Sequence, residues 1–154
     1  MTYAVLRVRG TVNVTSDIKK TLQLLNLTRV NHCTVVVEKP STKGMLQVAK
    51  DYTTWGEIDK EMLSKLITSR GKLEGDKELT NDYVKSATSY DNIDKLSQAI
   101  IDNKFKYKDI PNVKPIFRLN PPKKGYEGIK RSYINKGALG YRGKDINKLI
   151  KRMI

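Results

Sequence analysis

Residues 3–38 read YAVLRVRGTVNVTSDIKKTLQLLNLTRVNHCTVVVE, and their pattern decides the fold. From residue 3 to residue 9 the side chains alternate with a period of two, which is typical of a β-strand. The alternation separates three aliphatic side chains from two arginines: Ala4, Leu6 and Val8 against Arg7 and Arg9. The strand therefore predicts a sheet with one face packed on helices and one open face that presents guanidinium groups.

A helix follows this first strand. Ser16 or Asp17 can cap its start, and apolar residues then recur at the spacing of one helix face. That buried stripe consists of Ile18, Leu22 and Leu25. Residues 33–38 are rich in β-branched side chains and predict a second strand.

The remaining elements follow from periodicity and caps. Residues 42–48 suit a short helix and residues 50–55 a third strand, after which Thr54 and Glu57 have capping-box spacing for a helix that ends near Ser69. Two more helices and a short strand are expected at 81–87, 92–103 and 116–119. Asp145 can cap a last helix that docks back through one stripe: Ile146, Leu149, Ile150 and Met153. This order predicts an α+β sandwich.

The charge is unevenly distributed along the chain. Residues 114–154 hold twelve bases and two acids, which is +10 of the net +14, and five of the ten glycines. Residues 1–50 carry +6 and residues 51–113 carry −2. Because dense like charges repel unless a polyanion neutralises them, the C-terminal quarter predicts a basic arm that packs no core and binds nucleic acid. The head without this arm is expected to fold by itself, with the charge-balanced middle facing away from the polyanion.

Other classes of function find little support. The single cysteine, Cys33, excludes an internal disulfide, and with one histidine neither a metal site nor a nucleophile-base pair is convincing. The glycines at 137, 140 and 143 follow no predicted strand, so no nucleotide-binding loop is indicated. Arg7 and Arg9 interrupt any signal peptide, and no apolar run reaches the ~18 residues of a membrane span. A cytoplasmic protein without cofactor, membrane partner or small-molecule substrate is expected.

Three segments resemble a known family. They are VLRVRGTVNVTSDIKKTLQLLNLTRVNHCTVV from residue 5, STKGMLQVAKDYTTWGEI from residue 41, and FRLNPPKKG with INKLIKRMI near the C-terminus. Together they resemble the archaeal form of the large-subunit ribosomal protein L-thirty family, whose eukaryotic relative is the large-subunit protein seven. The resemblance implies a ferredoxin-like βαβαβ core with a three-stranded antiparallel sheet over residues 1–56. A helical extension over 57–113 and the basic arm with its terminal helix over 114–154 would complete the chain.

The same resemblance implies partners and binding residues. The partners are large-subunit ribosomal RNA, with 5S RNA in the family's neighbourhood, and neighbouring ribosomal proteins. The RNA-binding residues it implies are Arg7, Arg9, Lys19, Lys20, Arg29, Lys43, Lys123 and Lys124. Charge and aromatic spacing add Arg118, Tyr126, Lys130, Arg131, Tyr133, Lys136, Tyr141, Arg142 and Lys144. The three tyrosines either stack on bases or wedge against protein.

The predicted function is that of a non-enzymatic structural constituent of the large ribosomal subunit, which binds and stabilises its RNA. Two alternatives stay open from the residues alone. An RNA-processing or RNA-modifying enzyme would turn over RNA, and a DNA-compacting protein would bind duplex DNA at least as well as ribosomal RNA.

Overall fold

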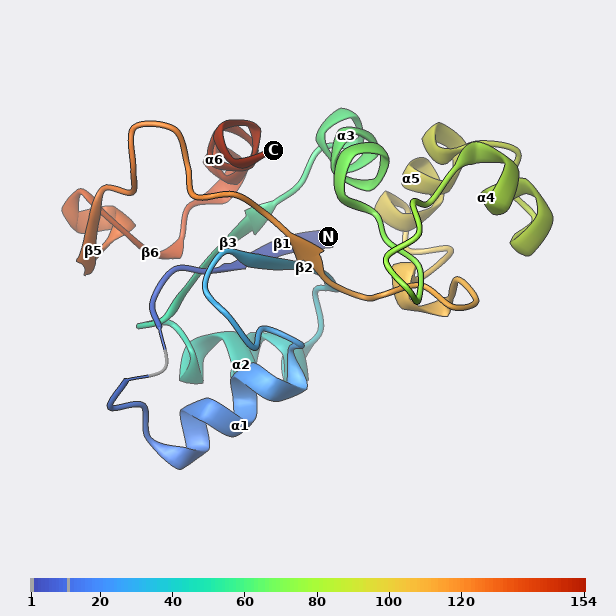
Figure 1. Cartoon of the computed structure of the whole chain (residues 1–154). Helices are drawn as coiled ribbons and strands as arrows, with labels where there is room; N and C mark the ends of the chain where they lie inside the picture. The colour runs from blue at the N-terminus through green and yellow to red at the C-terminus, as the bar shows by residue number, and fades with distance from the viewer. Residues whose placement is uncertain (1, 11) are drawn as a thin grey trace.

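The computed structural model describes residues 2–10 and 12–154. Within them a six-stranded sheet lies between two layers of helices (Figure 1). The strands are β1 (Thr2–Arg7), β2 (His32–Val37), β3 (Thr53–Glu57), β4 (Phe117–Arg118), β5 (Gly128–Ser132) and β6 (Gly137–Tyr141). The helices are α1 (Ser16–Leu24), α2 (Pro40–Val48), α3 (Lys60–Arg70), α4 (Asn81–Ala87), α5 (Ile93–Ile101) and α6 (Ile146–Met153). Short 3-10 turns are η1 (Tyr107–Asp109), η2 (Tyr133–Asn135) and η3 (Gly143–Asp145).

Strand β1 lies inside the sheet, whose order is β4-β2-β1-β3-β6-β5. It pairs antiparallel with both neighbours, so that Tyr3 stands opposite Val36 in β2 and Glu57 in β3. On the β2 side, β4 adds a short antiparallel pairing; on the β3 side, β6 runs parallel to β3 with β5 beyond it. The α+β class is confirmed. The sheet has six strands in the described residues, where three were expected, because the C-terminal quarter adds strands to both edges.

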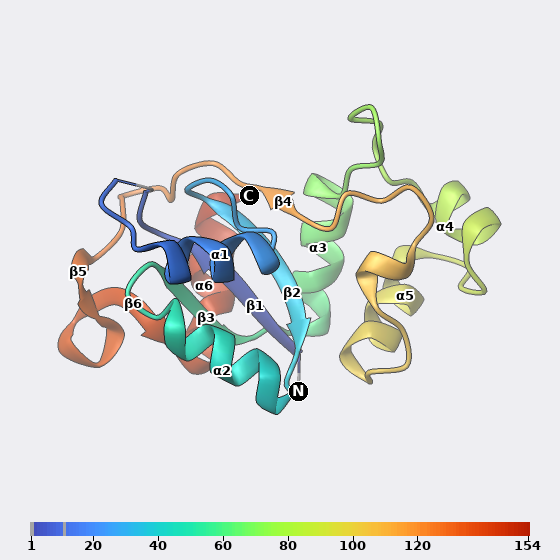
Figure 2. The same cartoon turned by 90° about the horizontal axis from the view of Figure 1, so that it is seen from below.

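Both faces of β1 are covered. All six of its residues are buried. Tyr3 and Val5 pack with α1 and α2, whereas Ala4 and Leu6 belong to the larger core under α3 and α6. The predicted open face is therefore wrong: the connecting helices α1 and α2 return over it, as Figure 2 shows from their side.

Helix α6 closes the larger core. Its apolar stripe is almost fully buried in the cluster that holds the inner face of α3: Ile146, Leu149, Ile150 and Met153. The predicted docking of the last helix is confirmed. The segment before it is no free arm, since Ala138 and Leu139 of β6 are buried beside Val8 and Gly140 pairs with Thr54 of β3. The expectation that residues 114–154 pack no core is wrong.

Element boundaries show where local signals succeed. Helix α4 spans the expected residues, and α5 begins after Asn92, whose Oδ1 accepts a hydrogen bond from the Lys95 amide at 2.8 Å. The prediction that Thr54 and Glu57 form a capping box is wrong, because both belong to β3 and α3 starts only at Lys60. Strand β3 pairs with β1 and β6, and these backbone hydrogen bonds outweigh a cap worth about 1 kcal/mol.

Two leucines on α1 test the orientation of this helix. Leu22 is 1% exposed and Leu24 is 66% exposed. Leu22→Ala should lower the free energy of unfolding by ~2–5 kcal/mol, because it opens a cavity under the sheet. Leu24→Ala makes the same change on the exposed side of α1, and it should cost less than ~1 kcal/mol. Urea denaturation of both variants measures the difference, and equal losses would show that α1 is oriented differently.

Candidate nucleic-acid interface

Four segments that are distant in sequence meet where β1 ends. The amide of Val8 donates to the carbonyl of Tyr52 at 2.9 Å, and the amide of Asn31 donates to the carbonyl of Arg7 at 2.9 Å. The amide of Leu119 in turn donates to the Asn31 carbonyl at 3.2 Å. The loops after β1, before β2, before β3 and after β4 therefore share one end of the sheet (Figure 2). We call this place the basic end, defined by Arg9, Arg29, Arg118, Lys123 and Lys124.

The cations of the basic end come from separate loops. Arg29, Arg118, Lys123 and Lys124 are exposed. The guanidinium of Arg9 lies over the ring of Tyr52, 5.2 Å from its centroid, which fixes its direction. Arg118 also forms a long ion pair with Asp76 at 3.4 Å, so part of its charge is compensated within the protein.

His32 reports the electrostatic character of this end. Burial lowers the pKa of its imidazole, and the positive charges of Arg118, Arg29 and Arg7 lower it further. A lowered pKa favours the neutral imidazole at pH 7, and the buried Nδ1 has no hydrogen-bond partner among the described residues. Burial is the largest cause of this shift, and the three guanidinium groups that add to it indicate a positive potential, which suits a phosphate.

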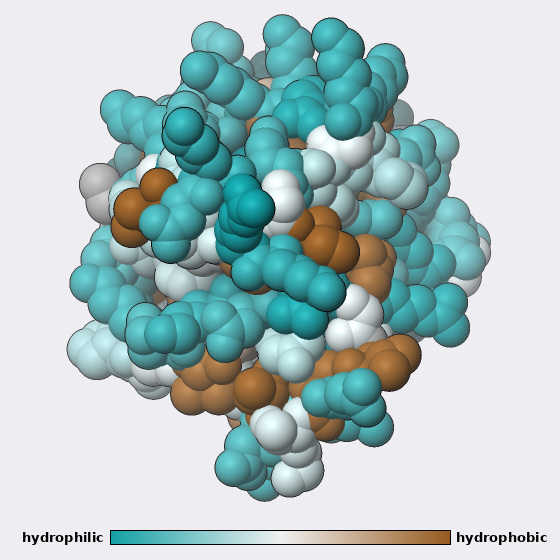
Figure 3. Space-filling model, turned by 90° about the vertical axis from the view of Figure 1, so that its left-hand side faces the viewer, coloured by the Kyte–Doolittle hydropathy of each residue, from teal (hydrophilic) through white to brown (hydrophobic). Residues whose placement is uncertain are grey.

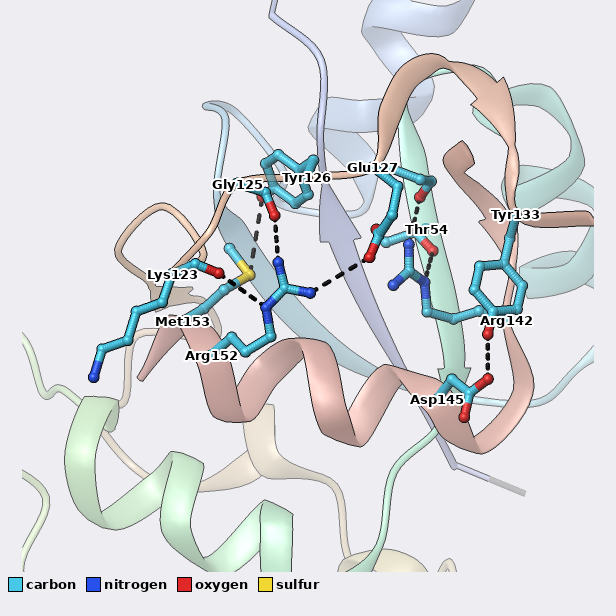
Figure 4. A network of polar contacts seen from close by, with 11 residues as sticks. Thr54, Lys123, Gly125, Tyr126, Glu127, Tyr133, Arg142, Asp145, Arg152 and Met153 are labelled. Carbon is cyan, nitrogen blue, oxygen red and sulfur yellow. Dashed lines mark hydrogen bonds and ion pairs between the residues drawn. The ribbon is translucent and has the colours of Figure 1, made fainter. Parts of the chain in front are cut away.

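Arg152 of α6 holds the loop that carries the two lysines (Figure 4). Its Nε donates to the carbonyl of Lys123 at 3.0 Å, another guanidinium nitrogen contacts the Gly125 carbonyl, and a third contact reaches Glu127 at 3.4 Å. The amide of Lys123 donates back to the Arg152 carbonyl at 3.0 Å. The loop is thereby positioned by a helix, while the ammonium groups of Lys123 and Lys124 stay outside. Sequence reasoning missed this role of Arg152, since the periodicity of α6 points only to its apolar stripe.

Arg7 lies inside the protein, against expectation. It is 2% exposed, and its guanidinium donates to the carbonyls of Leu27 at 2.8 Å and Arg9 at 3.0 Å. Burial lowers its pKa, although an arginine stays charged at neutral pH. The expectation that Arg7 presents its charge on an open sheet face is wrong, because α1 and the turn at Leu27 cover that face.

The contrast between Arg7 and Arg9 is testable. Arg7→Ala should destabilise the fold by about 1–3 kcal/mol, because the buried carbonyl of Leu27 and the partly buried carbonyl of Arg9 lose a charged donor. Arg9→Ala should leave the free energy of unfolding nearly unchanged and weaken RNA binding. Guanidinium denaturation and RNA filter binding on both variants separate these outcomes. A stable Arg7→Ala protein with impaired RNA binding would restore the open-face interpretation.

A second group of cations lies at the β5–β6 edge. Lys130, Arg131 and Lys136 are exposed there. Figure 3 shows this side of the molecule as mostly hydrophilic, with a band of apolar groups lower in the view and smaller apolar spots near its centre and left edge. Arg142 is different, because it is 6% exposed and its guanidinium donates to the Thr54 hydroxyl and to the Ala138 carbonyl, both at 2.8 Å. The sequence counted Arg142 among the RNA-binding residues, but its buried guanidinium ties β6 to β3 (Figure 4), and RNA contact by Arg142 stays a prediction.

Protein groups already engage the three candidate tyrosines. Tyr126 is partly buried and its hydroxyl bonds the Asn31 side chain. Tyr133 lies under the Arg142 guanidinium, 4.9 Å from its ring centroid, and its hydroxyl bonds Asp145, which raises the tyrosine pKa. Tyr141 bonds Glu57 and keeps 48% of its surface exposed. The structure shows the packing alternative for all three, and stacking on bases stays a prediction.

The other candidates lie elsewhere. Lys43 lies in the first turn of α2, which follows β2 at the opposite end of the sheet, and its ammonium pairs with Glu38 at 2.7 Å. This hydrogen bond lowers the pKa of the Glu38 carboxyl. Lys144 is exposed in η3, and Lys19 and Lys20 are exposed on α1. The predicted residues therefore form no single patch, and the basic end is where most loops converge.

Two further searches concern metals and membranes. In residues 2–10 and 12–154 no three histidine, cysteine, aspartate or glutamate side chains come together as a metal site would require. Over the same described residues, every helix is too short or too polar to cross a bilayer.

Fold and surface together define a class: small basic α+β proteins whose exposed cations suit a polyanion. Comparison with known proteins narrows this class. Residues 3–53 match the family model described as ribosomal protein L30p/L7e. The chain is 48% identical to the large ribosomal subunit protein uL30 of Methanocorpusculum labreanum, over 98% of this chain and 99% of that protein. Identities of 47% and 49% relate it to proteins of the same name from Methanosphaera stadtmanae and Thermoplasma volcanium, with at least 92% of each covered. The chain belongs to the ribosomal protein L30p/L7e family.

Proposed function

We propose that this protein is a structural, non-enzymatic constituent of the large ribosomal subunit, where it binds and stabilises ribosomal RNA. The relatives to which it is similar along almost their whole length are named as large ribosomal subunit proteins. The observation that carries the RNA-binding role is the basic end, where exposed cations lie on separate loops that the protein's own hydrogen bonds hold together.

The mechanism is neutralisation of closely spaced phosphates. Folded RNA brings backbones from separate helices together, and cations that replace their counterions release those ions into solution. Arg9 is held by Tyr52, and the loop of Lys123 and Lys124 is held by Arg152, so little side-chain and loop freedom is lost on binding. Arg29 and Arg118 supply charge from two further loops. Such a site bridges RNA segments by shape and charge rather than by reading base edges.

The assignment of parts of the chain is also a proposal. We infer that residues 1–56 act as a ferredoxin-like βαβαβ core, supported by the antiparallel pairing of β1 with β2 and β3. Residues 57–113 form the helical extension and residues 114–154 the basic C-terminal part, which contributes to the fold as well as to binding. The neighbouring partners are ribosomal proteins, and contact with 5S RNA stays a prediction from the resemblance.

The two alternatives are less well supported. Neither RNA processing nor DNA compaction accounts for full-length similarity to proteins named as large-subunit constituents. A turnover assay on RNA and a competition between duplex DNA and ribosomal RNA address them directly.

Co-sedimentation tests the proposal. The tagged chain, expressed in an archaeal host, should sediment with large subunits in stoichiometric amount and remain there through a high-salt wash. A loosely bound basic protein would leave at high salt, because its attachment is purely ionic. Complete release by salt, or equal association with bulk DNA, would contradict the ribosomal assignment.

A further inference from the structure

Strand β2 is paired along its whole length on one side only. Its residues from Cys33 to Val37 stand opposite β1. On the other side, β4 pairs only with His32 and Cys33, and the Thr34 hydroxyl donates to the Pro115 carbonyl at 3.3 Å. Among the described residues no strand pairs with the outer edge of residues 35–37. This leaves about 10 Å of open edge in a run of three valines, the kind of edge to which another strand readily adds.

A cavity of about 200 Å³ lies along this open edge. Leu24, Leu25 and Met45 line it from the α1 and α2 side. Ile100 and Phe105 line it from the helical extension. Figure 2 shows β2 between these two parts of the molecule, beside α1 and α2 and facing the region of α5. The lining thus offers apolar side chains together with a free strand edge.

The rim of the cavity is cationic. Lys39, Lys106 and Lys108 belong to its lining and are exposed, and none of the described residues that line it is acidic. A charge-complementary occupant carries carboxylates or phosphates. RNA fits poorly, because a ribose-phosphate chain would lose hydration against Leu24, Met45 and Phe105 and has no amide groups to pair with a strand. A second copy of this chain would bring the same three lysines against one another.

We propose that the open edge of β2 receives an extended segment of a neighbouring protein. The segment adds a strand to residues 35–37, directs alternate apolar side chains into the cavity, and places acidic side chains near Lys39, Lys106 and Lys108. Main-chain hydrogen bonds supply affinity in this mode, and the pocket selects alternate side chains. The inference rests on the proposed function, because it needs an assembly with neighbouring proteins. If the chain sediments with large subunits but the outer edge of β2 stays unpaired there, this inference is contradicted while the proposed function stands.

Site-specific photo-cross-linking tests the occupant. A benzophenone amino acid replaces Lys106 on the rim or, as a matched control, Lys85 on the outer side of α4, which is exposed in the same extension. Each full-length variant is assembled into large subunits, and the irradiated particles are digested with nuclease or protease. The Lys106 position should yield an adduct with an acidic segment of another protein that the Lys85 position does not. An adduct with RNA alone, an adduct with a second copy, or no adduct above the control would overturn the proposal.

Hydrogen exchange on the unmodified chain keeps the test independent of the variants. The outward-facing amides of residues 35–37 should exchange at least about tenfold more slowly in the subunit than in the free protein, because they gain a ladder partner. Exchange of the inward amides, already paired with β1, should change much less. Equal exchange of the outward amides in the two states would overturn the proposal even where cross-linking is inefficient.

Discussion

A chain shortened to residues 1–120 is expected not to fold. It loses β6, which pairs with β3 in the sheet, and the whole of α6, whose apolar stripe fills part of the larger core. Four side chains of that stripe are at most 1% exposed: Ile146, Leu149, Ile150 and Met153. Removal of one such side chain costs ~2–5 kcal/mol. The joint loss of all four is therefore comparable to the whole ~5–15 kcal/mol that stabilises an ordinary domain. Circular dichroism should show no cooperative thermal transition, and a sharp transition would mean that the head folds alone.

Two isoleucine variants control for the size of the truncation. Ile150 is fully buried in α6, whereas Ile134 is 89% exposed in η2. Ile150→Ala should lower the free energy of unfolding by ~2–5 kcal/mol, and Ile134→Ala should change it by less than ~0.5 kcal/mol. Equal effects would show that the C-terminal quarter does not dock as described.

Strongly periodic segments were predictable from the sequence. The stripe of α6 and the caps of α4 and α5 are local signals, and neighbouring residues in the chain decide them. The pairing of Thr54 with Gly140 joins residues 86 positions apart, and no local pattern announces it. A segment counted as a basic arm therefore contains a buried strand. Gly137 lies in this strand, and a Cβ there would collide with the Arg131 carbonyl, so the close packing of the chain requires glycine at this position.

The candidate site was only partly predictable for a similar reason. Period-two alternation shows which side chains of β1 share a face, but it does not show whether another element covers that face. Arg7 thus counted as a binding residue although Leu27 and Arg9 accept its hydrogen bonds. Charge counting likewise included Arg142, which bonds Thr54 in the interior. The convergence of Arg29 and Lys123 at one end depends on the tertiary fold alone.

Removal of three charges at the basic end should have the largest effect on RNA binding. The variant carries Arg29→Gln, Lys123→Gln and Lys124→Gln, all at exposed positions. If each cation neutralises one phosphate, the loss of one cation lowers the affinity by about 0.9 log unit for each tenfold dilution of salt below 1 M. The loss of all three should therefore weaken binding at 0.1 M salt on the order of 10²- to 10³-fold. The matched control removes the same charge from exposed lysines of the middle segment: Lys65, Lys85 and Lys104. Its affinity should stay within about threefold of the parent.

The salt dependence of this binding tests most directly whether the basic end lies on ribosomal RNA. Affinities of the parent, the basic-end variant and the middle-segment variant are measured on one large-subunit RNA fragment from low to high salt. The slope of log K against log salt should flatten by about 2 to 3 units in the basic-end variant, because each lost phosphate contact removes about 0.9. The middle-segment variant should retain the parent slope. Parallel lines for the parent and the basic-end variant, or equal flattening in both variants, would contradict an RNA interface at the end of β1.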